Sequence, residues 1–348
     1  MDGRGDAPEL NSRMLTRRAL LVPQHGELSS EPFPVSLYRY RQTAMATGWE
    51  ITLPGLAAMQ MDLVDEAFSR LHDIESRLTV YRDESEVSSL NRLQSGVRVP
   101  ITPDLVEVLG RCLNWWEMTG GAFDVACGRM IKEWGFFKGP ASVPRPEAPG
   151  IQPEANGMDK VDLDLAERTF RWKAQGVELN FGCVGKGFAV DAMAGILTTT
   201  RVLQAGLVQS GGSSARAWGV CPGEGQGWRV AVRHPWKADA VIAEVLLQDD
   251  AIGTSAGSYR HLIHCGRRLP HVLNPATAWP AAGMASVTVL APEAMMADAL
   301  STAFFVLGTQ KAGKLIGQFM GVTALFMEES GKIVVIGEQP ARFHVCSV

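Results

Sequence analysis

The 348-residue sequence has no surplus of positive charge, few cysteines and no long run of apolar residues. Its 33 lysines and arginines are outnumbered by 37 aspartates and glutamates, and the formal net charge is −4. Binding to nucleic-acid phosphates needs clustered Lys and Arg, so this balance argues against a nucleic-acid-binding protein. No apolar run reaches the ~20 residues of a membrane-spanning helix. The stretch at 19–22 stops at Pro23 and is too short for a secretory signal.

The six cysteines show no spacing that would suit zinc or a redox pair. They are spread over the chain without a C-x-x-C motif: Cys112, Cys127, Cys183, Cys221, Cys265 and Cys346. We therefore expect reduced, mostly buried thiols and a cytoplasmic protein.

The residues that are present predict a folded chain with a large core, since 46% are hydrophobic and 20% are charged. A chain of this length buries roughly 75% of its unfolded surface, so folding needs no disulfide or structural metal. Residues 1–37 lack apolar periodicity and are predicted to be a mobile N-terminal leader. We expect one folded domain over 38–348, with the segment at 137–157, rich in Pro, Gly and Glu, as the candidate junction between subdomains.

Apolar periodicity predicts helices at 57–78, 103–119, 187–197, 294–307 and 311–319. Thr102 is expected to be the N-cap of the second helix, with Pro103 in its first turn. Short β-like runs occur at 177–181, 206–209, 228–233, 243–247, 286–290, 323–328 and 333–336. Strands and helices mixed in this order favour an α+β fold.

The first segment that could carry chemistry is the glycine-rich stretch from Asn180 to Asp191, where an extended run leads into a helix. Glycines let backbone N–H groups approach a phosphate, the helix N-terminus adds positive potential, and Lys186 supplies a charge. The stretch is neither a Walker loop nor G-x-G-x-x-G. The alternative interpretation is a tight strand-to-helix turn with a surface lysine.

The second segment contains Asp298 and Thr302, four residues apart in an apolar helix. Side chains at this spacing lie on one helical face, so a carboxylate and a hydroxyl could together bind a hard cation such as Mg²⁺. The alternative is an aspartate on an exposed face, with the threonine bonded back to a helix carbonyl.

The third segment places His271 before an Asn-Pro turn, where it could act as a general base because the ordinary pKa of histidine lies near working pH. His261 and His264 lie close in sequence, so residue type alone does not single out His271, and a structural role stays open. Two glycine-rich stretches, 119–124 and 210–214, could let a ligand approach the backbone. Asp124 could accept a hydrogen bond from a sugar hydroxyl or hold a loop.

Taken together and in this order, the segments resemble the ApbE family, the FAD:protein FMN transferases, from about residue 43 to 308. The matching motifs are Met45 to Thr47 (M-G-T in the family), Leu78 to Asn91 (S-x-Y-x-x-x-S-E-(I/V)-x-x-L-N), Thr119 to Asp124 (T-G-G-A-F-D), Leu179 to Asp191 (L-(D/N)-(L/F)-G-G-I-A-K-G-(Y/F)-A-x-D), Ser210 to Ser213, Gly253 to Ser255, His271 to Thr277 (H-I-(I/D)-(D/N)-P-x-T-G) and Ser286 to Gly308. The resemblance implies an ApbE-like fold with mixed or antiparallel sheets and packed helices.

The resemblance also implies an activity: Mg²⁺-dependent transfer of FMN from FAD to a threonine hydroxyl of an acceptor protein, with release of AMP. By resemblance, Mg²⁺ is bound by the side chains of Asp298 and Thr302 and by the main-chain carbonyl of Cys183, and His271 takes the proton from the threonine. The FAD contacts implied by the family are Met45, Tyr81, Ala122, Phe123, Asp124, Asn180, Lys186 and Val272.

The sequence departs from the family pattern at a few positions around these motifs. Ala276, Ala278 and Trp279 replace polar and glycine positions, which predicts a narrower outer wall of the flavin or acceptor pocket. Ser213 stands where many members have an acid. Neither departure removes an implied metal ligand or the base. Two other functions stay open: an Mg²⁺-dependent FAD pyrophosphatase giving FMN and AMP, and a non-catalytic FAD-binding protein.

Overall fold

The computed structural model describes residues 21–23, 36–55, 61–138, 141–145, 148, 151–199, 203–223, 225–237, 239–258 and 261–346. Most of the predicted mobile leader, 1–37, lies outside the described residues. Of that segment, Leu21–Pro23 forms strand β1, which pairs with strand β9, and residue 37 begins strand β2. The described part of the predicted junction at 137–157 is irregular chain apart from 3-10 conformation at Ile151 and in the short turn η3 (Pro153–Ala155).

The helices and strands alternate along the chain and confirm the predicted α+β class. The helices are α1 (Met61–Leu78), α2 (Glu86–Asn91), α3 (Pro103–Met118), α4 (Gly128–Glu133), α5 (Gly185–Thr199) and α6 (Ala294–Leu315), with further 3-10 turns η4 (Met158–Lys160), η5 (Ile316–Gln318) and η6 (Pro340–Arg342). The remaining strands are β2 (Leu37–Ala44), β3 (Thr47–Pro54), β4 (Arg98–Pro100), β5 (Val161–Asp164), β6 (Thr169–Trp172), β7 (Gly206–Ser210), β8 (Ser214–Trp218), β9 (Trp228–Arg233), β10 (Val241–Leu247), β11 (Ala251–Ala256), β12 (His261–His264), β13 (Arg267–Pro270), β14 (Leu273–Asn274), β15 (Trp279–Pro280), β16 (Met284–Ala291), β17 (Thr323–Glu328), β18 (Ile333–Gly337) and β19 (Phe343–Val345).

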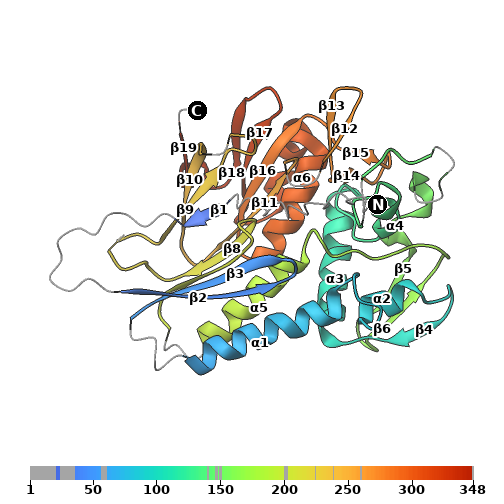
Figure 1. The fold of residues 1–348 in the computed structure, drawn as a ribbon, viewed down its shortest axis with the longest axis horizontal. Helices are drawn as coiled ribbons and strands as arrows, with labels where there is room; N and C mark the ends of the chain where they lie inside the picture. The colour runs from blue at the N-terminus through green and yellow to red at the C-terminus, as the bar shows by residue number, and fades with distance from the viewer. Residues whose placement is uncertain are drawn as a thin grey trace, which may run out of the picture.

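An eight-stranded sheet in the order β18-β17-β16-β11-β8-β7-β3-β2 forms the centre of the molecule (Figure 1). Every neighbouring pair in it is antiparallel. Strand β16 is buried at all of its residues. Its sequence is nearly all apolar, as expected for a strand with layers packed on both faces of the sheet.

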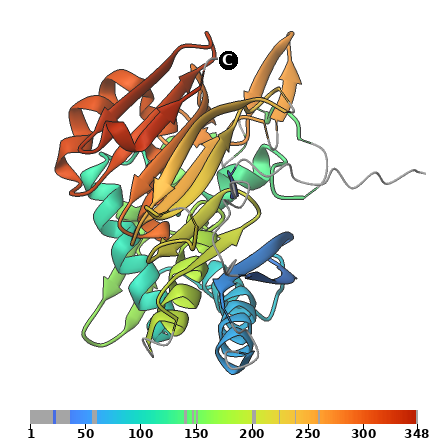
Figure 2. The same ribbon diagram turned by 90° about the vertical axis from the view of Figure 1, so that its left-hand side faces the viewer.

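The two faces of this sheet are covered by different layers (Figures 1 and 2). A four-stranded sheet, β1-β9-β10-β19, packs on one face, where Leu207 and Ala217 of the large sheet share a core with Val230 and Val245. Helices α1, α5 and α6 contribute to the main core on the other face. Figure 1 shows α1 and α5 below β2, β3 and β8, with β9 and β10 above them.

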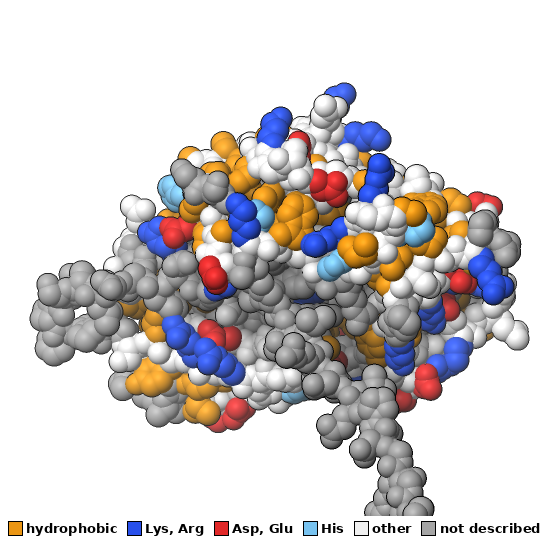
Figure 3. All heavy atoms as spheres, turned by 45° about the horizontal axis from the view of Figure 1, so that its top comes forward, with side chains coloured by type: hydrophobic (Ala, Val, Ile, Leu, Met, Phe, Trp, Pro, Cys, Tyr) orange, Lys and Arg blue, Asp and Glu red, His pale blue; other side chains and the backbone are white. Residues whose placement is uncertain are grey.

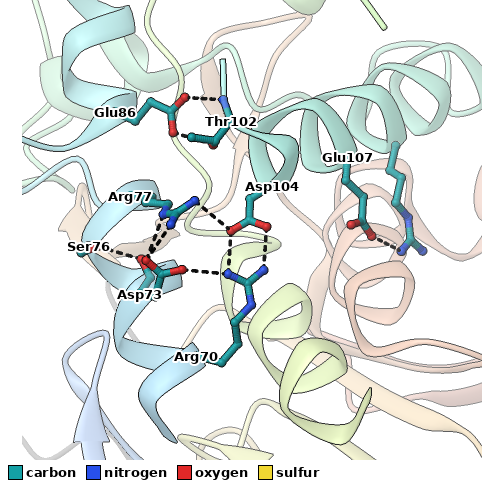
Figure 4. Close-up of polar contacts among 9 residues, drawn as sticks. Arg70, Asp73, Ser76, Arg77, Glu86, Thr102, Asp104 and Glu107 are labelled. Carbon is teal, nitrogen blue, oxygen red and sulfur yellow. Dashed lines mark hydrogen bonds and ion pairs between the residues drawn. The ribbon is translucent and has the colours of Figure 1, made fainter. Parts of the chain in front are cut away.

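Helices α1 and α3 are joined by charged side chains (Figure 4). Arg70 donates to both carboxylate oxygens of Asp104, at 2.8 and 2.6 Å, and to Asp73 at 2.9 Å. Arg77 donates to the other oxygen of Asp73 at 3.0 Å. A guanidinium that binds a carboxylate with two parallel hydrogen bonds fixes orientation as well as distance. The pair therefore sets how α3 lies against α1.

Polar contacts between distant segments act at two places where the sequence made a local prediction. Thr102 is the N-cap residue of α3 and Pro103 lies in the first turn, as predicted, but the Thr102 hydroxyl makes no capping hydrogen bond: its N–H and hydroxyl both donate to Glu86, at 2.8 and 2.6 Å. The segment 177–181 is not a strand. Instead, the Asn91 side chain pairs with the backbone of Leu179, donating to its carbonyl at 2.9 Å and accepting from its N–H at 2.7 Å.

The element α6 contains two helices separated by non-helical backbone at Gly308, in agreement with the break predicted between 294–307 and 311–319. Gly308 has φ 71° and ψ 169°, a conformation that glycine adopts without steric cost. The last residues of the second predicted helix form η5 and Phe319. In the described part of the chain, no helix is both long enough and apolar enough to cross a membrane.

Candidate active site

A cavity of about 220 Å³ lies where α5, α6, β11 and the loop after β13 meet. Ten of the twelve site residues implied by the family resemblance line it: Tyr81, Ala122, Asp124, Asn180, Cys183, Lys186, His271, Val272, Asp298 and Thr302. The structure thus brings together residues from five separate sequence motifs. Met45 and Phe123 do not line the cavity.

Two glycines let α6 approach the segments that carry the other site residues. A Cβ at Gly187 in the first turn of α5 would lie 2.4 Å from the carbonyl oxygen of Ala294. A Cβ at Gly253 in β11 would lie 2.7 Å from the backbone nitrogen of Asp298. Both distances are shorter than any ordinary contact, so only glycine permits this packing. As a result, Asp298 lies beside the N-terminus of α5.

The N-terminus of α6 is held by Asp191, a residue of α5. One carboxylate oxygen of Asp191 accepts from the N–H of Ala294 at 2.9 Å, and the other accepts from Met295 at 2.8 Å. Arg216 of β8 donates to the same carboxylate at 2.7 Å. A carboxylate at a helix N-terminus satisfies free N–H groups and complements the helix dipole. Asp191 therefore fixes the start of α6 against α5 and β8.

Asp298 is buried, with 5% of its surface exposed, so the interpretation of an aspartate on an exposed helical face is wrong. Its carboxylate accepts from the N–H of Gly187 at 2.8 Å and from the hydroxyl of Ser214 at 2.7 Å. Burial raises the pKa of Asp298 to about 6, although the charge of Lys186 and these hydrogen bonds lower it. Burying a carboxylate costs free energy, which these hydrogen bonds and the nearby Lys186 offset in part; a bound cation would offset more of it.

The oxygens around Asp298 fit a hard cation. Thr302 lies one turn further along α6, with its hydroxyl 3.2 Å from the carbonyl of Asp298 and 3.1 Å from the hydroxyl of Ser255. The bond of Thr302 to a helix carbonyl, which was part of the alternative interpretation, is therefore present as well. Among the described residues there is no group of three or more His, Cys, Asp or Glu side chains that could bind a metal. One carboxylate with neutral oxygens is a typical protein contribution to Mg²⁺, which keeps water or phosphate as its other ligands.

The glycine turn before α5 presents backbone and a lysine to the cavity. Asn180 stabilises the turn, because its side-chain oxygen accepts from the N–H of Gly182 at 2.9 Å. Lys186 is half-buried and donates to the carbonyl of Gly182 at 3.3 Å. Cys183 also lines the cavity, and burial raises the pKa of its thiol to about 12. A neutral thiol is a poor ligand for a hard cation, so the metal-binding role that the family resemblance implies for Cys183 would fall to its carbonyl oxygen.

Asp124 holds a loop, as the sequence allowed, and also lines the cavity. Its two oxygens accept from the N–H groups of Ala126 at 2.7 Å and Met158 at 3.1 Å. Burial raises the pKa of Asp124 to about 6, and the two backbone hydrogen bonds act in the opposite direction. The neighbouring Ala122 lines the cavity, whereas Phe123 is fully buried and packs edge-on against Trp115 in the core.

His271 and Val272 line the cavity directly after strand β13. The ring of His271 packs edge-on against Phe136, with centroids 6.5 Å apart. Two nearby residues differ from the family pattern. Trp279 is 46% exposed and packs edge-on against Trp134. Ala278, at the family's glycine position, is buried and has φ 55°. This positive φ is typical of glycine and strained for alanine. The turn therefore keeps a glycine-like backbone although the residue is alanine.

Tyr81 lines the cavity and Met45 does not. Tyr81 is 53% exposed and stacks on Phe137 with centroids 4.7 Å apart. Met45 is at the tip of the β2–β3 hairpin, where its N–H donates to Glu75 at 2.6 Å. It has φ 49° and packs against the main core, and Thr47 on the same hairpin lines the cavity instead.

Five cavity residues that carry hydroxyl groups were not assigned a role from the sequence. They are Thr47, Ser213, Thr254, Ser255 and Ser301. Ser214 was also not assigned a role, although it donates to Asp298. The signal that could have found them is that they lie in or directly after family-like motifs, at 45–47, 210–213, 253–255 and 286–308. Serine and threonine are too common for their chemistry alone to mark a site.

The fold and the cavity together define an α+β protein whose site combines a buried carboxylate, a glycine turn with a lysine, and a histidine. A model of the ApbE family matches residues 45–326. The chain is 32% identical over 280 residues to a protein of Treponema pallidum named FAD:protein FMN transferase, with 76% of each chain covered. It is 33% identical over 256 residues to the protein of that name from Haemophilus influenzae, with 71% of this chain and 73% of the other covered.

The fold comparison agrees with the sequence comparison. The crystal structure of the ApbE protein from Thermotoga maritima matches with a TM-score of 0.78 and 27% identity, over 86% of this chain and 97% of the other. This chain belongs to the ApbE family. The resemblance stated from the motifs is thereby confirmed.

Proposed function

We propose that this protein transfers FMN from FAD to a threonine hydroxyl of an acceptor protein and releases AMP, in a reaction that requires Mg²⁺. Family membership and the activity named for its relatives support the proposal. The structural observation that carries it is that Asp298 of α6, Lys186 of the glycine turn and His271 line one cavity. A cytoplasmic location is part of the same proposal, and the six free thiols suit a reducing compartment.

In this proposal, Mg²⁺ would be held by Asp298 and Thr302 and by the carbonyl oxygen of Cys183. A bound Mg²⁺ withdraws electron density from phosphoryl oxygens and offsets their negative charge. The chain itself keeps Asp298 in place through Gly187 and Ser214, so the carboxylate needs little reorganisation to bind a cation. Lys186 supplies a fixed positive charge to the phosphate that leaves.

The transfer step forms one P–O bond and breaks another. The threonine oxygen attacks the phosphorus of the FMN half of FAD, the pyrophosphate bond breaks, and AMP leaves with the electron pair. A threonine hydroxyl is a weak nucleophile at neutral pH, so a base has to accept its proton. His271 is that base in our proposal, and a positioned base typically contributes ~10²–10⁴-fold to the rate.

FAD contacts are proposed for the remaining family-implied residues. Asn180 and the backbone of the glycine turn would face the diphosphate, and Tyr81 offers an exposed aromatic face to the flavin ring. Asp124 could accept from a hydroxyl of FAD. Met45 and Phe123 lie outside the cavity lining, so we expect them to act by supporting the hairpin tip and the turn rather than through their side chains on FAD.

The test is incubation of the protein with FAD, MgCl₂ and a candidate acceptor domain, followed by intact-mass analysis and AMP quantification. We expect covalent flavin on the acceptor and an equal amount of AMP. An acceptor that stays unmodified in all conditions would refute the transferase proposal. AMP with free FMN would then indicate the pyrophosphatase, and stable FAD binding without AMP would indicate a binding protein.

The matched variant is His271→Ala. We expect transfer to slow by ~10²–10⁴-fold while the dissociation constant for FAD stays within about twofold. If FAD affinity falls as much as the rate, His271 is a binding residue and not the base.

A further inference from the structure

The β12–β13 hairpin, 261–270, stands out from the body of the molecule beside the cavity (Figures 1 and 2). Among the described residues its two strands pair only with each other, and its last residue, Pro270, directly precedes His271. Pro270 is buried, and the cross-strand pair Leu262 and Leu269 packs against the core cluster that contains Trp134. The hairpin is therefore anchored at its base and connected directly to the proposed catalytic base.

Two arginines give this hairpin a positive charge. Its residues include His261, His264, Arg267 and Arg268 and no carboxylate. Both arginines are exposed, and neither has an ion pair within the part of the chain that the structure describes. Burial and the neighbouring charge of Arg268 lower the pKa of His261. Arginines in the body of the molecule, such as Arg216, are instead paired with carboxylates.

Hydrophobic side chains lie next to these charges. Ile263 is 60% exposed and is the cross-strand partner of Arg268. The guanidinium of Arg268 lies 5.7 Å from the ring centre of Trp236, which is 39% exposed and belongs to the β9–β10 connection. Arg267 follows on the opposite face of the hairpin, next to the turn, because neighbouring residues of a strand alternate between its two faces. We call Trp236, Ile263, Arg267 and Arg268 the docking strip. Figure 3 shows Lys and Arg side chains beside hydrophobic ones over the upper half of the view, with some acidic side chains among them.

Tryptophan and arginine are among the side chains that contribute most to binding in protein interfaces, and Ile263 adds exposed apolar area beside them. We infer that the docking strip binds an acidic segment of the acceptor protein and so brings the acceptor threonine to His271. This inference rests on the proposed function, because it concerns the acceptor of that reaction. The two arginines, which have no ion pair with any described residue, supply the charge complementarity, and the covalent link through Pro270 places the strip at the edge of the cavity.

The experiment uses two fluorescein-labelled synthetic peptides of about twenty residues, each with one central threonine. Six aspartates flank the threonine in the first peptide and six serines in the second. Fluorescence anisotropy measures their binding to the full chain at low and high salt. We expect the aspartate peptide to bind at least ~10-fold more tightly than the serine peptide, with the difference lost in 0.5 M NaCl because exposed charges are screened.

The variant R267E/R268E tests the strip, and K311E/K332E is its control because it changes the net charge equally. Lys311 and Lys332 are exposed and lie outside the strip. R267E/R268E should lose the preference for the aspartate peptide, whereas K311E/K332E should bind it like the native chain. Equal FAD affinity and equal thermal midpoints show that the variants keep the cavity and the fold, as expected for surface substitutions.

The inference is overturned if R267E/R268E binds the aspartate peptide as tightly as the native chain, or if both peptides bind equally to the native chain. A single-stranded oligonucleotide of similar charge that binds more tightly than the aspartate peptide, and depends on the same arginines, would assign the strip to nucleic acid instead. None of these measurements needs turnover. The transferase proposal fails if AMP and covalent flavin do not form. The peptide-binding result is independent of that outcome, so the two failures can be told apart.

Discussion

Substitution of Gly187 by alanine tests whether the contact between α5 and α6 sets the geometry of the cavity. The new Cβ would lie 2.4 Å from the carbonyl oxygen of Ala294, whereas ordinary contacts begin at 3.4 Å, so one helix has to move by about 1 Å. Inserting a methyl group into packing of this kind typically costs ~1–3 kcal/mol. The displaced helix also carries Asp298, which accepts from the N–H of Gly187.

Gly195 provides a matched control in the same helix. It is exposed, and a Cβ built on it meets nothing within 4 Å. Alanine there should stabilise the protein by up to ~1 kcal/mol, because glycine is the poorer helix former. Gly187→Ala gains a similar helix propensity, so the difference between the two variants isolates the steric clash. We expect Gly187→Ala to be less stable than Gly195→Ala by ~1–3 kcal/mol.

Urea unfolding followed by tryptophan fluorescence measures the free energy of unfolding of both variants under the same conditions. Titration with FAD in MgCl₂ then measures the effect on the cavity. Gly187→Ala should bind FAD more weakly in Mg²⁺, and Gly195→Ala should bind it like the native chain. If the two variants have equal free energies of unfolding, the close approach of α5 and α6 does not constrain the fold, and our account of how Asp298 is positioned is wrong.

Three further predictions concern the cavity and its turns. Mg²⁺-dependent FAD binding should weaken about tenfold from pH 7 to pH 5. The cation needs the carboxylate form of Asp298, and burial raises the pKa of this group to about 6. Equal Mg²⁺ affinities in titrations at pH 7 and pH 5 would contradict this. Asp191→Asn should weaken Mg²⁺-dependent FAD binding, because Asp191 holds the start of α6. Asp250→Asn, at a similarly buried ion pair outside the cavity lining, should leave this binding unchanged. Equal effects of the two substitutions would show that Asp191 only stabilises the fold. Ala46→Gly and Ala278→Gly should each raise the free energy of unfolding by up to ~1 kcal/mol and so raise the thermal midpoint. The reason is that both alanines are strained by positive φ values, 56° and 55°, which glycine adopts without cost. An unchanged or lower midpoint in calorimetry would show that the surroundings have removed the strain.

Local patterns predicted the helices well and one strand wrongly. The expected helices at 103–119 and 187–197 correspond to α3 and α5, since apolar periodicity and glycine or proline signals are properties of neighbouring residues. The extended run at 177–181 has the composition of a strand, but its partner is a side-chain amide 88 residues earlier. Asn91 satisfies that backbone in place of a neighbouring strand, and nothing within 177–181 indicates such a partner.

The sequence by itself determined the family, the order of the motifs and most of the candidate site, because side-chain chemistry and short spacings are written in consecutive residues. Only the tertiary structure decided that Asp298 is buried, that Met45 and Phe123 lie outside the cavity lining, and that Asp191 holds the start of α6. Asp298 is bonded to Gly187 and Ser214, which are 111 and 84 positions away. Contacts at such separations depend on sheet register and on how closely two helices pack, and no local pattern encodes either.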